Sequence, residues 1–264
     1  MRAIEAIGDR KVRLQETEDP APRPGHATVR VAAFSINRGE TYQLEQPRPG
    51  WRPGKDLAGT VVAAAPDGSG PGPGARVVGH VDDSAWAEQA LVPVTRLAEL
   101  PDHVSFVTAA ALPLAGLAAL RLVRLASPLA SRRVLLTGAS GGLGHYFVEL
   151  AAAQGALVTA ITASEERGQR LGELGAAAVI HDVDEALGPF DVAIESVGGA
   201  TAKAVWHKLE QRGLMLWIGQ ASRTPANLDY FDWDGAMSVT IRKFNYMDST
   251  HTQRPKISQP SSGS

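Results

Sequence analysis

A cluster of glycines near the middle of the chain has the spacing of a phosphate-binding turn. Before it lies a short apolar run at residues 134–136, typical of a buried strand, and after it apolar residues recur at helical spacing. Glycine lets the backbone approach a pyrophosphate closely, and a helix N-terminus offers free N–H groups. The residues expected to hold the pyrophosphate are Gly138, Ala139, Ser140, Gly141, Gly142, Leu143 and Gly144.

The elements around this turn predict a dinucleotide site. A second β-branched run at residues 157–161 completes a strand, turn, helix and strand within about thirty residues, which is the unit that binds dinucleotides. The alternative is a structural turn without a ligand.

The end of the second strand indicates which dinucleotide binds. NAD sites usually place an acid there, about twenty residues past the glycines, to bond the ribose hydroxyls. Here the strand ends with Thr162-Ala163-Ser164, and Arg167 and Arg170 follow on the next helix. Ser164 and the arginines would hold a 2′-phosphate, so we predict NADP(H), with Thr162, Ser164 and Arg167 in its site. The alternative for the arginines is a solvated helix face.

Helices and strands alternate after the turn. We expect these elements as helices at 165–174 and 200–210 and strands at 178–181, 191–196 and 213–219, with an outer strand at 237–244. Such alternation implies an α/β fold with a doubly wound parallel sheet.

The first hundred residues are instead a series of short strands between turn signals. The expected strands are Arg2–Ile7, Val12–Gln15, Thr28–Ile36, Leu57–Ala65, Arg76–Val81 and Ala85–Val92. Their spacing suggests a small antiparallel barrel. Residues 105–126 are helical in pattern, with Ser105 as N-cap and a break at Pro113.

These patterns divide the chain into three parts. We expect a barrel-like domain at 1–124, a dinucleotide-binding domain at 125–247 and a disordered tail at 248–264, because the tail is polar and rich in serine and proline.

Composition excludes several classes of function. The 264 residues carry a net charge of −2, which gives no reason to expect nucleic acid or an anionic membrane as partner. With no cysteine, the chain has no disulfides, no thiolate catalysis and no cysteine-bound zinc. The N-terminus does not look like a signal peptide, and no apolar stretch is long enough to span a bilayer, so we expect a cytoplasmic protein.

Several stretches in one order resemble a known superfamily. They are residues 53–62 (PGKDLAGTVV), 74–79 (GARVVG), 87–90 (AEQA), 110–119 (AALPLAGLAA), the glycine turn and 195–199 (ESVGG). Together they resemble the zinc-free medium-chain dehydrogenase/reductase superfamily, in its quinone oxidoreductase and enoyl reductase-like branch. The resemblance covers residues 1 to about 245. It implies a GroES-like barrel domain joined to a Rossmann domain, with Ser196 and Val197 at the cofactor.

The zinc-dependent branch of that superfamily has Gly-His-Glu where this chain has Gly54-Lys55-Asp56. A lysine replaces the ligand histidine, and the structural-zinc cysteines are missing, so no metal is expected. Lys55 is either a pocket cation or a solvated loop charge. No two histidines have the spacing of a metal-binding pair, and we expect all of them in surface or loop positions. They are His26, His80, His103, His145, His181, His207 and His251.

The glycine turn also fits the short-chain dehydrogenases. That family begins its chain with the turn, whereas here some 130 residues precede it. It also needs a Tyr-x-x-x-Lys pair, but no tyrosine of this chain is followed by a lysine four residues later. The tyrosines are Tyr42, Tyr146, Tyr230 and Tyr246. The short-chain family is therefore rejected.

The resemblance implies that a nicotinamide cofactor delivers hydride to a conjugated carbonyl: a quinone, an enone or an enoyl thioester. It places residues 35–42 beside the nicotinamide, which makes Asn37 and Tyr42 the candidate catalytic residues. Each has a structural alternative, a loop-capping asparagine and a half-buried tyrosine. Arg38 replaces a smaller residue usual in the family.

Family members normally continue for several dozen residues beyond the outer strand, so either the chain is naturally shortened or its C-terminal part has been lost. In both cases we expect part of the substrate cleft to be missing. A second hypothesis therefore stays open: a protein that keeps the fold but transfers no hydride, either a redox-neutral cyclase-like enzyme or a nucleotide-binding interaction module. By family analogy the partners are a small-molecule substrate and a second copy, bound through the outer strand at Ser238–Lys243.

Overall fold

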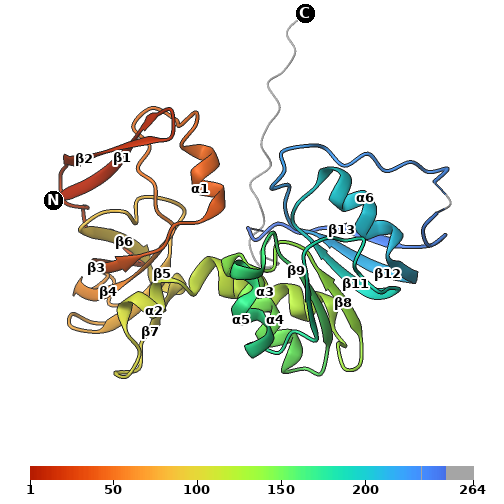
Figure 1. Ribbon diagram of the computed structural model, residues 1–264. Coiled ribbons are helices and arrows are strands. Elements are labelled where there is room, and N and C mark those ends of the chain that lie inside the picture. Colours follow the sequence, from red (N-terminus) through yellow and green to blue (C-terminus); the bar gives the residue numbers. More distant parts are fainter. Residues whose placement is uncertain (233, 248–264) are drawn as a thin grey trace, which may run out of the picture.

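The computed structural model describes residues 1–232 and 234–247. Figure 1 shows two halves joined by a helical segment: a strand-rich N-terminal half in red to yellow, and a half in green to blue in which helices cover a parallel sheet. The predicted α/β class and both predicted sheet types are confirmed. The predicted tail at 248–264 lies outside the described residues.

The N-terminal half is built on a five-stranded antiparallel sheet with strand order β6-β3-β4-β5-β7. Its strands are β3 (His26–Phe34), β4 (Asp56–Ala63), β5 (Arg76–His80), β6 (Gln89–Pro93) and β7 (Leu97–Glu99), with a 3-10 turn at Val94–Arg96. A hairpin of β1 (Arg2–Gly8) and β2 (Lys11–Glu16) lies beside it. The sheet curls because alternate side chains such as Val29, Leu57, Val61 and Val77 converge on one apolar core.

Strand β6 is shorter than predicted. It begins at Gln89 rather than Ala85, because the preceding backbone is drawn to the loop before β4. There the N–H groups of Ala85 and Trp86 donate to the carbonyl oxygens of Gly54 and Pro53 at 3.0 and 3.1 Å. The apolar character that suggests a strand here reflects burial of a loop.

Two helices connect the halves, α2 (Phe106–Ala110) and α3 (Pro113–Ala126). The predicted cap and break are confirmed: the Ser105 hydroxyl accepts from the Thr108 N–H at 3.1 Å, and Pro113 is the first residue of α3. The buried face of α3 belongs to the core of the C-terminal half. The predicted boundary at residue 124 falls inside α3, and the division into domains stays a prediction.

The C-terminal half contains a six-stranded parallel sheet of order β10-β9-β8-β11-β12-β13. The strands are β8 (Arg133–Leu136), β9 (Leu157–Ile161), β10 (Ala178–Ile180), β11 (Phe190–Glu195), β12 (Leu209–Trp217) and β13 (Thr240–Lys243). Helices α4 (Gly142–Ala152), α5 (Glu165–Glu173) and α6 (Gly199–His207) join them. In chain order the strands read 3-2-1-4-5-6, the order of a dinucleotide-binding Rossmann sheet.

One predicted helix end is wrong. Helix α6 ends at His207, and residues 209–210 already belong to β12 rather than to a helix reaching Glu210. Leu209 is buried and pairs with Phe190, which draws the chain into the sheet early. A register shift follows, in which Arg212 takes a positive φ of 64° before regular pairing resumes at Leu214.

No helix within the described residues is long and apolar enough to cross a lipid bilayer.

Candidate active site

The glycine turn lies between β8 and α4 at the carboxyl end of the sheet. Gly138 has a φ of +63°, and a Cβ there would lie 2.5 Å from the Ser196 Oγ. A Cβ on Gly144 would lie 2.2 Å from the carbonyl oxygen of Ala139. The first glycine therefore permits the turn and the last permits close packing of α4 on it.

The N-terminus of α4 is open to an anion. Gly141 is its N-cap and has no side chain that could accept from the first turn. The N–H groups of Gly142, Leu143 and Gly144 therefore have no acceptor within the helix. The turn is also at the switch point between β8 and β11, where ligands bind in sheets of this type. These residues suit the pyrophosphate of a dinucleotide.

The tip of β9 lies beside the turn, because the Ala139 N–H donates to the carbonyl oxygen of Ile161 at 3.0 Å. Thr162 is 2 % exposed and its hydroxyl faces the Ser164 carbonyl, so its side chain points inward. Ser164 is the N-cap of α5, and Arg167 is exposed on the first turns of that helix. Ser164 and Arg167 thus lie at the start of the helix that follows β9, whereas the Thr162 side chain is buried, and their contact with a 2′-phosphate stays a prediction.

A buried carboxyl group at the end of β11 holds the backbone on the other side of the glycine turn. Glu195 is fully buried and accepts from the N–H groups of Val197 and Gly198 at 2.7 and 3.0 Å. Burial raises the pKa of Glu195 despite these donors. Ser196 donates its hydroxyl to the Thr137 carbonyl at 3.0 Å, which ties the end of β11 to the end of β8. Ser196 therefore borders the glycine turn, and a role for Ser196 and Val197 at the cofactor stays a prediction.

The two candidate catalytic residues lie at the start and within a short helix that the sequence did not predict, α1 (Arg38–Gln43). Asn37 precedes this helix, and its amide donates to Asp56 Oδ2 at 2.9 Å. Tyr42 is half-buried beneath the Arg223 guanidinium, which lies 4.5 Å from the ring centre. The Tyr42 hydroxyl accepts from Arg38 at 3.2 Å and lies 3.5 Å from the Ala221 carbonyl oxygen. Tyr42 therefore lies where the two halves meet.

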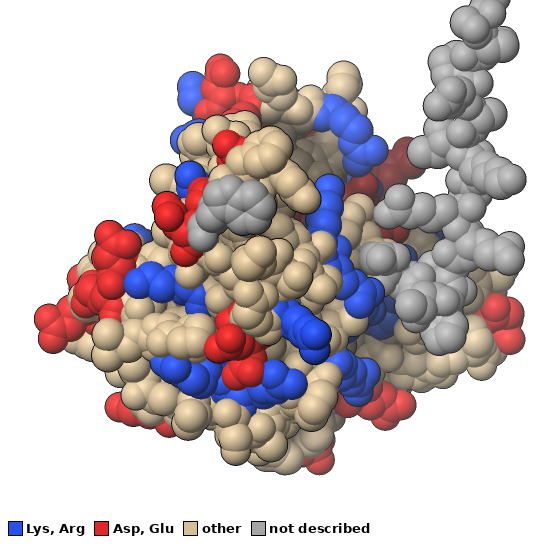
Figure 2. Space-filling view, turned by 90° about the vertical axis from the view of Figure 1, so that its right-hand side faces the viewer, with Lys and Arg blue, Asp and Glu red and all other residues tan. Residues whose placement is uncertain are grey.

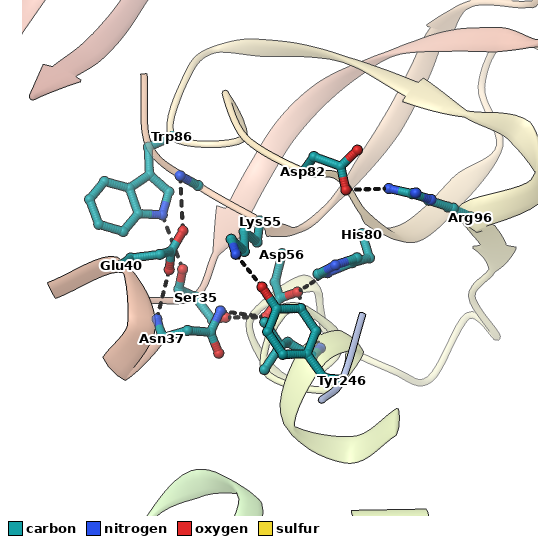
Figure 3. A network of polar contacts seen from close by, with 12 residues as sticks. Ser35, Asn37, Glu40, Lys55, Asp56, His80, Asp82, Trp86, Arg96 and Tyr246 are labelled. Atoms are coloured by element: carbon teal, nitrogen blue, oxygen red, sulfur yellow. Dashed lines mark hydrogen bonds and ion pairs between the residues drawn. The ribbon is translucent and has the colours of Figure 1, made fainter. Parts of the chain in front are cut away.

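Asp56 is the centre of a polar network that sequence reasoning missed (Figure 3). Its side chain is 1 % exposed. The donors that converge on this carboxylate are the Ser35 hydroxyl at 2.9 Å, the Asn37 amide at 2.9 Å, the His80 ring at 2.8 Å and the Leu114 N–H at 3.2 Å. His80 is therefore the last residue of a strand and is engaged by a carboxylate, and the expectation that it is a surface or loop residue is wrong.

Lys55 extends the network toward the C-terminal half. Its ammonium donates to the Tyr246 hydroxyl and lies 5.0 Å from the centre of that ring. The Tyr246 carbonyl in turn accepts from Arg121 on α3 at 2.6 Å. Lys55 is half-buried rather than a solvated loop charge, and its role as a pocket cation stays a prediction.

This network lies next to the glycine turn. Leu114 at the start of α3 donates to Asp56, and the next residue, Ala115, lies against the turn, where a Cβ on Gly142 would be 3.8 Å away. Two consecutive residues of α3 therefore contact the buried carboxylate and the glycine turn that is the predicted pyrophosphate site. Across the same junction Arg223 donates to Glu45 Oε2 at 2.9 Å. This contact with Arg223 lowers the pKa of Glu45 to about 2.

The described residues contain no group of three or more His, Asp or Glu side chains that could hold a metal ion.

Two family models match the chain. The model of the alcohol dehydrogenase GroES-like domain matches residues 23–102, and that of the zinc-binding dehydrogenases matches residues 142–257. The first match falls on the antiparallel sheet and the second on the sheet that carries the glycine turn. Together they cover most of the chain.

Individual relatives point the same way. The chain is 24% identical to the acryloyl-coenzyme A reductase of Metallosphaera sedula, over 85% of this chain and 78% of the relative. It is 31% identical to the quinone oxidoreductase of Pongo abelii, over 65% of this chain and 54% of the relative, so it spans about half the length of that protein. The structure of Escherichia coli quinone oxidoreductase complexed with NADPH superposes with a TM-score of 0.83 at 25% identity, over 93% of this chain and 81% of that one.

The strand order, the glycine turn at its switch point and the two matched domains agree with one another. The chain belongs to the medium-chain dehydrogenase/reductase superfamily, in its quinone oxidoreductase- and enoyl reductase-like branch.

Proposed function

We propose that the protein is an NADPH-dependent reductase that delivers hydride to a conjugated carbonyl (a quinone, an enone or an enoyl thioester) without zinc. The observation that carries the proposal is the open N-terminus of α4 at the switch point of the sheet, which is linked to the Asp56 network by two consecutive residues of α3, Leu114 and Ala115. The relatives whose names include quinone oxidoreductase and acryloyl-coenzyme A reductase support this class of substrate.

Different residues of the chain bind different parts of the cofactor. The N–H groups of Gly142, Leu143 and Gly144 hold the pyrophosphate, and Ser164 and Arg167 bind the 2′-phosphate. When bound, the reduced nicotinamide supplies the hydride.

On the substrate side, negative charge develops on the carbonyl oxygen as the hydride arrives, and hydrogen-bond donors must stabilise it. The Lys55 ammonium and the Tyr246 and Tyr42 hydroxyls are the donors at this junction, and Asn37 fixes the carboxylate beside them. The substrate is therefore proposed to bind between α1 and the start of α3.

Independence of zinc rests on the donor set. Lys55 stands where the zinc-dependent branch has its ligand histidine, and its ammonium is already paired with Tyr246. An ammonium has no lone pair for a metal. Dialysis against a strong chelator should leave NADPH oxidation unchanged, and loss of activity restored by zinc would contradict the proposal.

Cofactor binding and turnover test the proposal separately. Calorimetric titration should give tighter binding of NADPH than of NADH, and Arg167→Gln should remove most of that preference. Glu173→Gln, at the other end of α5, is the matched control and should keep it. Equal affinity for both cofactors in the wild type would contradict the NADPH assignment.

Turnover is then followed by NADPH absorbance with a panel of quinones, enones and enoyl thioesters. Oxidation by at least one acceptor is expected. The second candidate is a protein that binds the nucleotide without hydride transfer, and it is favoured by one observation: Arg38 already occupies the Tyr42 hydroxyl. Tight binding with no oxidation by any acceptor would establish this candidate and overturn the reductase.

A further inference from the structure

His80 is a titratable side chain placed where a reduction needs one. It ends β5, its ring Nδ1 lies 2.8 Å from Asp56 Oδ1, and its side chain is 21 % exposed. The hydrogen bonds among the described residues engage Nδ1 and leave Nε2 free. A histidine with one nitrogen anchored to a carboxylate and the other free can pass a proton to or from a bound molecule.

Asp56 is built to orient that ring. Figure 3 shows its carboxylate with His80 on one side and Ser35 and Asn37 on the other. Because Ser35 and Asn37 hold Oδ2, and Leu114 shares Oδ1 with His80, the carboxylate cannot rotate away from the imidazole. A carboxylate in this position fixes the Nδ1–H tautomer and stabilises the imidazolium.

The Asp56–His80 pair lies close to the glycine turn that is proposed to bind the cofactor. Asp56 contacts the N–H of Leu114, and Ala115 lies against Gly142 of the turn. The charged and titratable groups around the ring are Asp56, Lys55 and the Tyr246 phenol, whose ring lies edge-on to His80 at 6.4 Å. None of the glycine-turn contacts uses His80, so its nitrogen is available to a substrate.

We propose that His80 is the proton donor that completes the reduction of a conjugated carbonyl, with Asp56 as its positioning residue; this rests on the reductase function proposed above. The hydride would come from the reduced nicotinamide, whose C–H bond breaks as the cofactor is oxidised; a C–H bond forms at the β-carbon of the substrate, and the C=C electron pair moves into an enolate. The Nε2–H bond of protonated His80 then breaks, its electron pair stays on nitrogen, and the proton bonds to the α-carbon. The imidazole recovers a proton from water, so each turnover consumes one NADPH and one proton.

The choice of acceptor separates a proton donor from a merely structural residue. An enolate must be protonated on carbon, which is slow without a positioned acid, whereas a reduced quinone carries its charge on oxygen and is protonated by water. His80→Gln should therefore lower kcat for an α-substituted enone by about 10²-fold or more, while quinone reduction stays within about threefold. His103→Gln, at an exposed turn before α2, is the control and should leave both rates unchanged.

Stereochemistry gives a second readout. In deuterated water the wild type should place deuterium on one face of the α-carbon, and His80→Gln should give both faces. If the wild type reduces the enone and His80→Gln does so at the same rate with the same face, His80 is not the donor although the reductase function stands. If the wild type reduces no acceptor, the reductase function and the proton donor fall together.

A third readout does not depend on turnover. In ¹⁵N NMR spectra of the full chain, neutral His80 should be the Nδ1–H tautomer, and Asp56→Asn should abolish that preference without changing NADPH affinity. An Nε2–H tautomer in the wild type would overturn the assignment of Asp56 as the positioning residue and of Nε2 as the donor.

Discussion

Single residues at the strand ends carry the chemistry of this site, and each buried polar group is held by several donors. Glu195 accepts from two backbone N–H groups at the end of β11, and Asp56 accepts from four donors at the start of β4. A buried carboxyl without such partners would cost several kcal/mol. The donors therefore fix where each carboxyl points.

Glu195 gives a prediction about pH. Burial raises its native pKa above the ordinary value of 4.5, so the folded protein binds its proton more tightly than the unfolded chain does. Its contribution to stability therefore falls as pH rises from 4.5 through the native pKa. Glu195→Gln removes this titration, so the variant should gain stability relative to the wild type across that window. Urea unfolding at several pH values measures the difference, and a difference independent of pH would contradict it.

Gly144 gives a prediction about packing. A Cβ there would lie 2.2 Å from the Ala139 carbonyl, a backbone atom that cannot move aside. Gly144→Ala should lower the free energy of unfolding by about 1–3 kcal/mol and weaken NADPH binding, because α4 must shift off the turn. Gly172→Ala on α5, where a Cβ would meet nothing within 4 Å, is the control and should be neutral or stabilising. Equal effects of the two substitutions would contradict the packing argument.

Residues whose role depends on neighbours in sequence were the predictable ones. The glycine turn, the Ser105 cap and the Pro113 break are local patterns, and all three have the predicted conformation. The Asp56–His80 pair and the Lys55–Tyr246 pair join residues that are far apart in the chain. Only the folded sheet brings them together, so no spacing rule could reveal them.

At the scale of elements, the short helix α1 acts as a connector between the two halves. Its Tyr42 packs beneath Arg223, and Glu45 just beyond it binds both Arg223 and Arg10. Arg10 and Arg223 both adopt a positive φ, 60° and 63°, and they lie on different halves of the molecule. The contact therefore couples α1 to the loop after β12.

Arg223 gives a prediction about this coupling. Arg223→Gln should speed amide exchange of α1 by roughly two- to fivefold, as expected for loss of a largely exposed ion pair. The wild-type contact should weaken as pH falls from 4.5 toward 2, since the pKa of Glu45 is lowered to about 2. Arg48→Gln, which removes a separate exposed pair with Asp83, is the control. An unchanged rate of amide exchange of α1 in Arg223→Gln would show that contacts other than the Arg223–Glu45 pair hold the two halves together.

Strand and helix types were largely predictable, and their ends were less so. Alternating and buried apolar runs identified β9, α5 and most strands of both sheets, whereas the three-residue strand β7 was not predicted. The early start of β12 and late start of β6 depend on long-range hydrogen bonds and on burial of Leu209. Tertiary contacts of this kind override local propensity. Helix α1 was missed because six residues without apolar periodicity carry no helical signal.

At the scale of the whole molecule, the outer strand β13 is an unpaired edge. All four of its residues are exposed, and Figure 2 shows this side of the molecule with lysine and arginine side chains spread across its middle. In a symmetric antiparallel pair of edges, Ile241 would face the partner copy's arginine at position 242, so like charges would not be directly opposed. The edge is therefore compatible with the proposed homodimer.

The molar mass of the protein in solution tests the proposed homodimer. Light scattering of the wild type should give twice the chain mass, and Ile241→Lys should give a monomer, because lysine would then oppose arginine across the edge. Leu187→Lys, at an exposed apolar residue elsewhere, is the control and should stay dimeric. A wild type of single-chain mass would refute the proposal.

The central claim is that the nucleotide held at the glycine turn gives its hydride to a conjugated carbonyl beside Asp56 and His80. The most direct measurement follows that hydride, using NADPH labelled with deuterium at C4 and mass spectrometry of the reduced enone. The account predicts one deuterium at the β-carbon of the product, and labelled product should form more slowly with Gly144→Ala than with the wild type at the same NADPH concentration. Bound NADPH that is never consumed, or a product without the label, would contradict it.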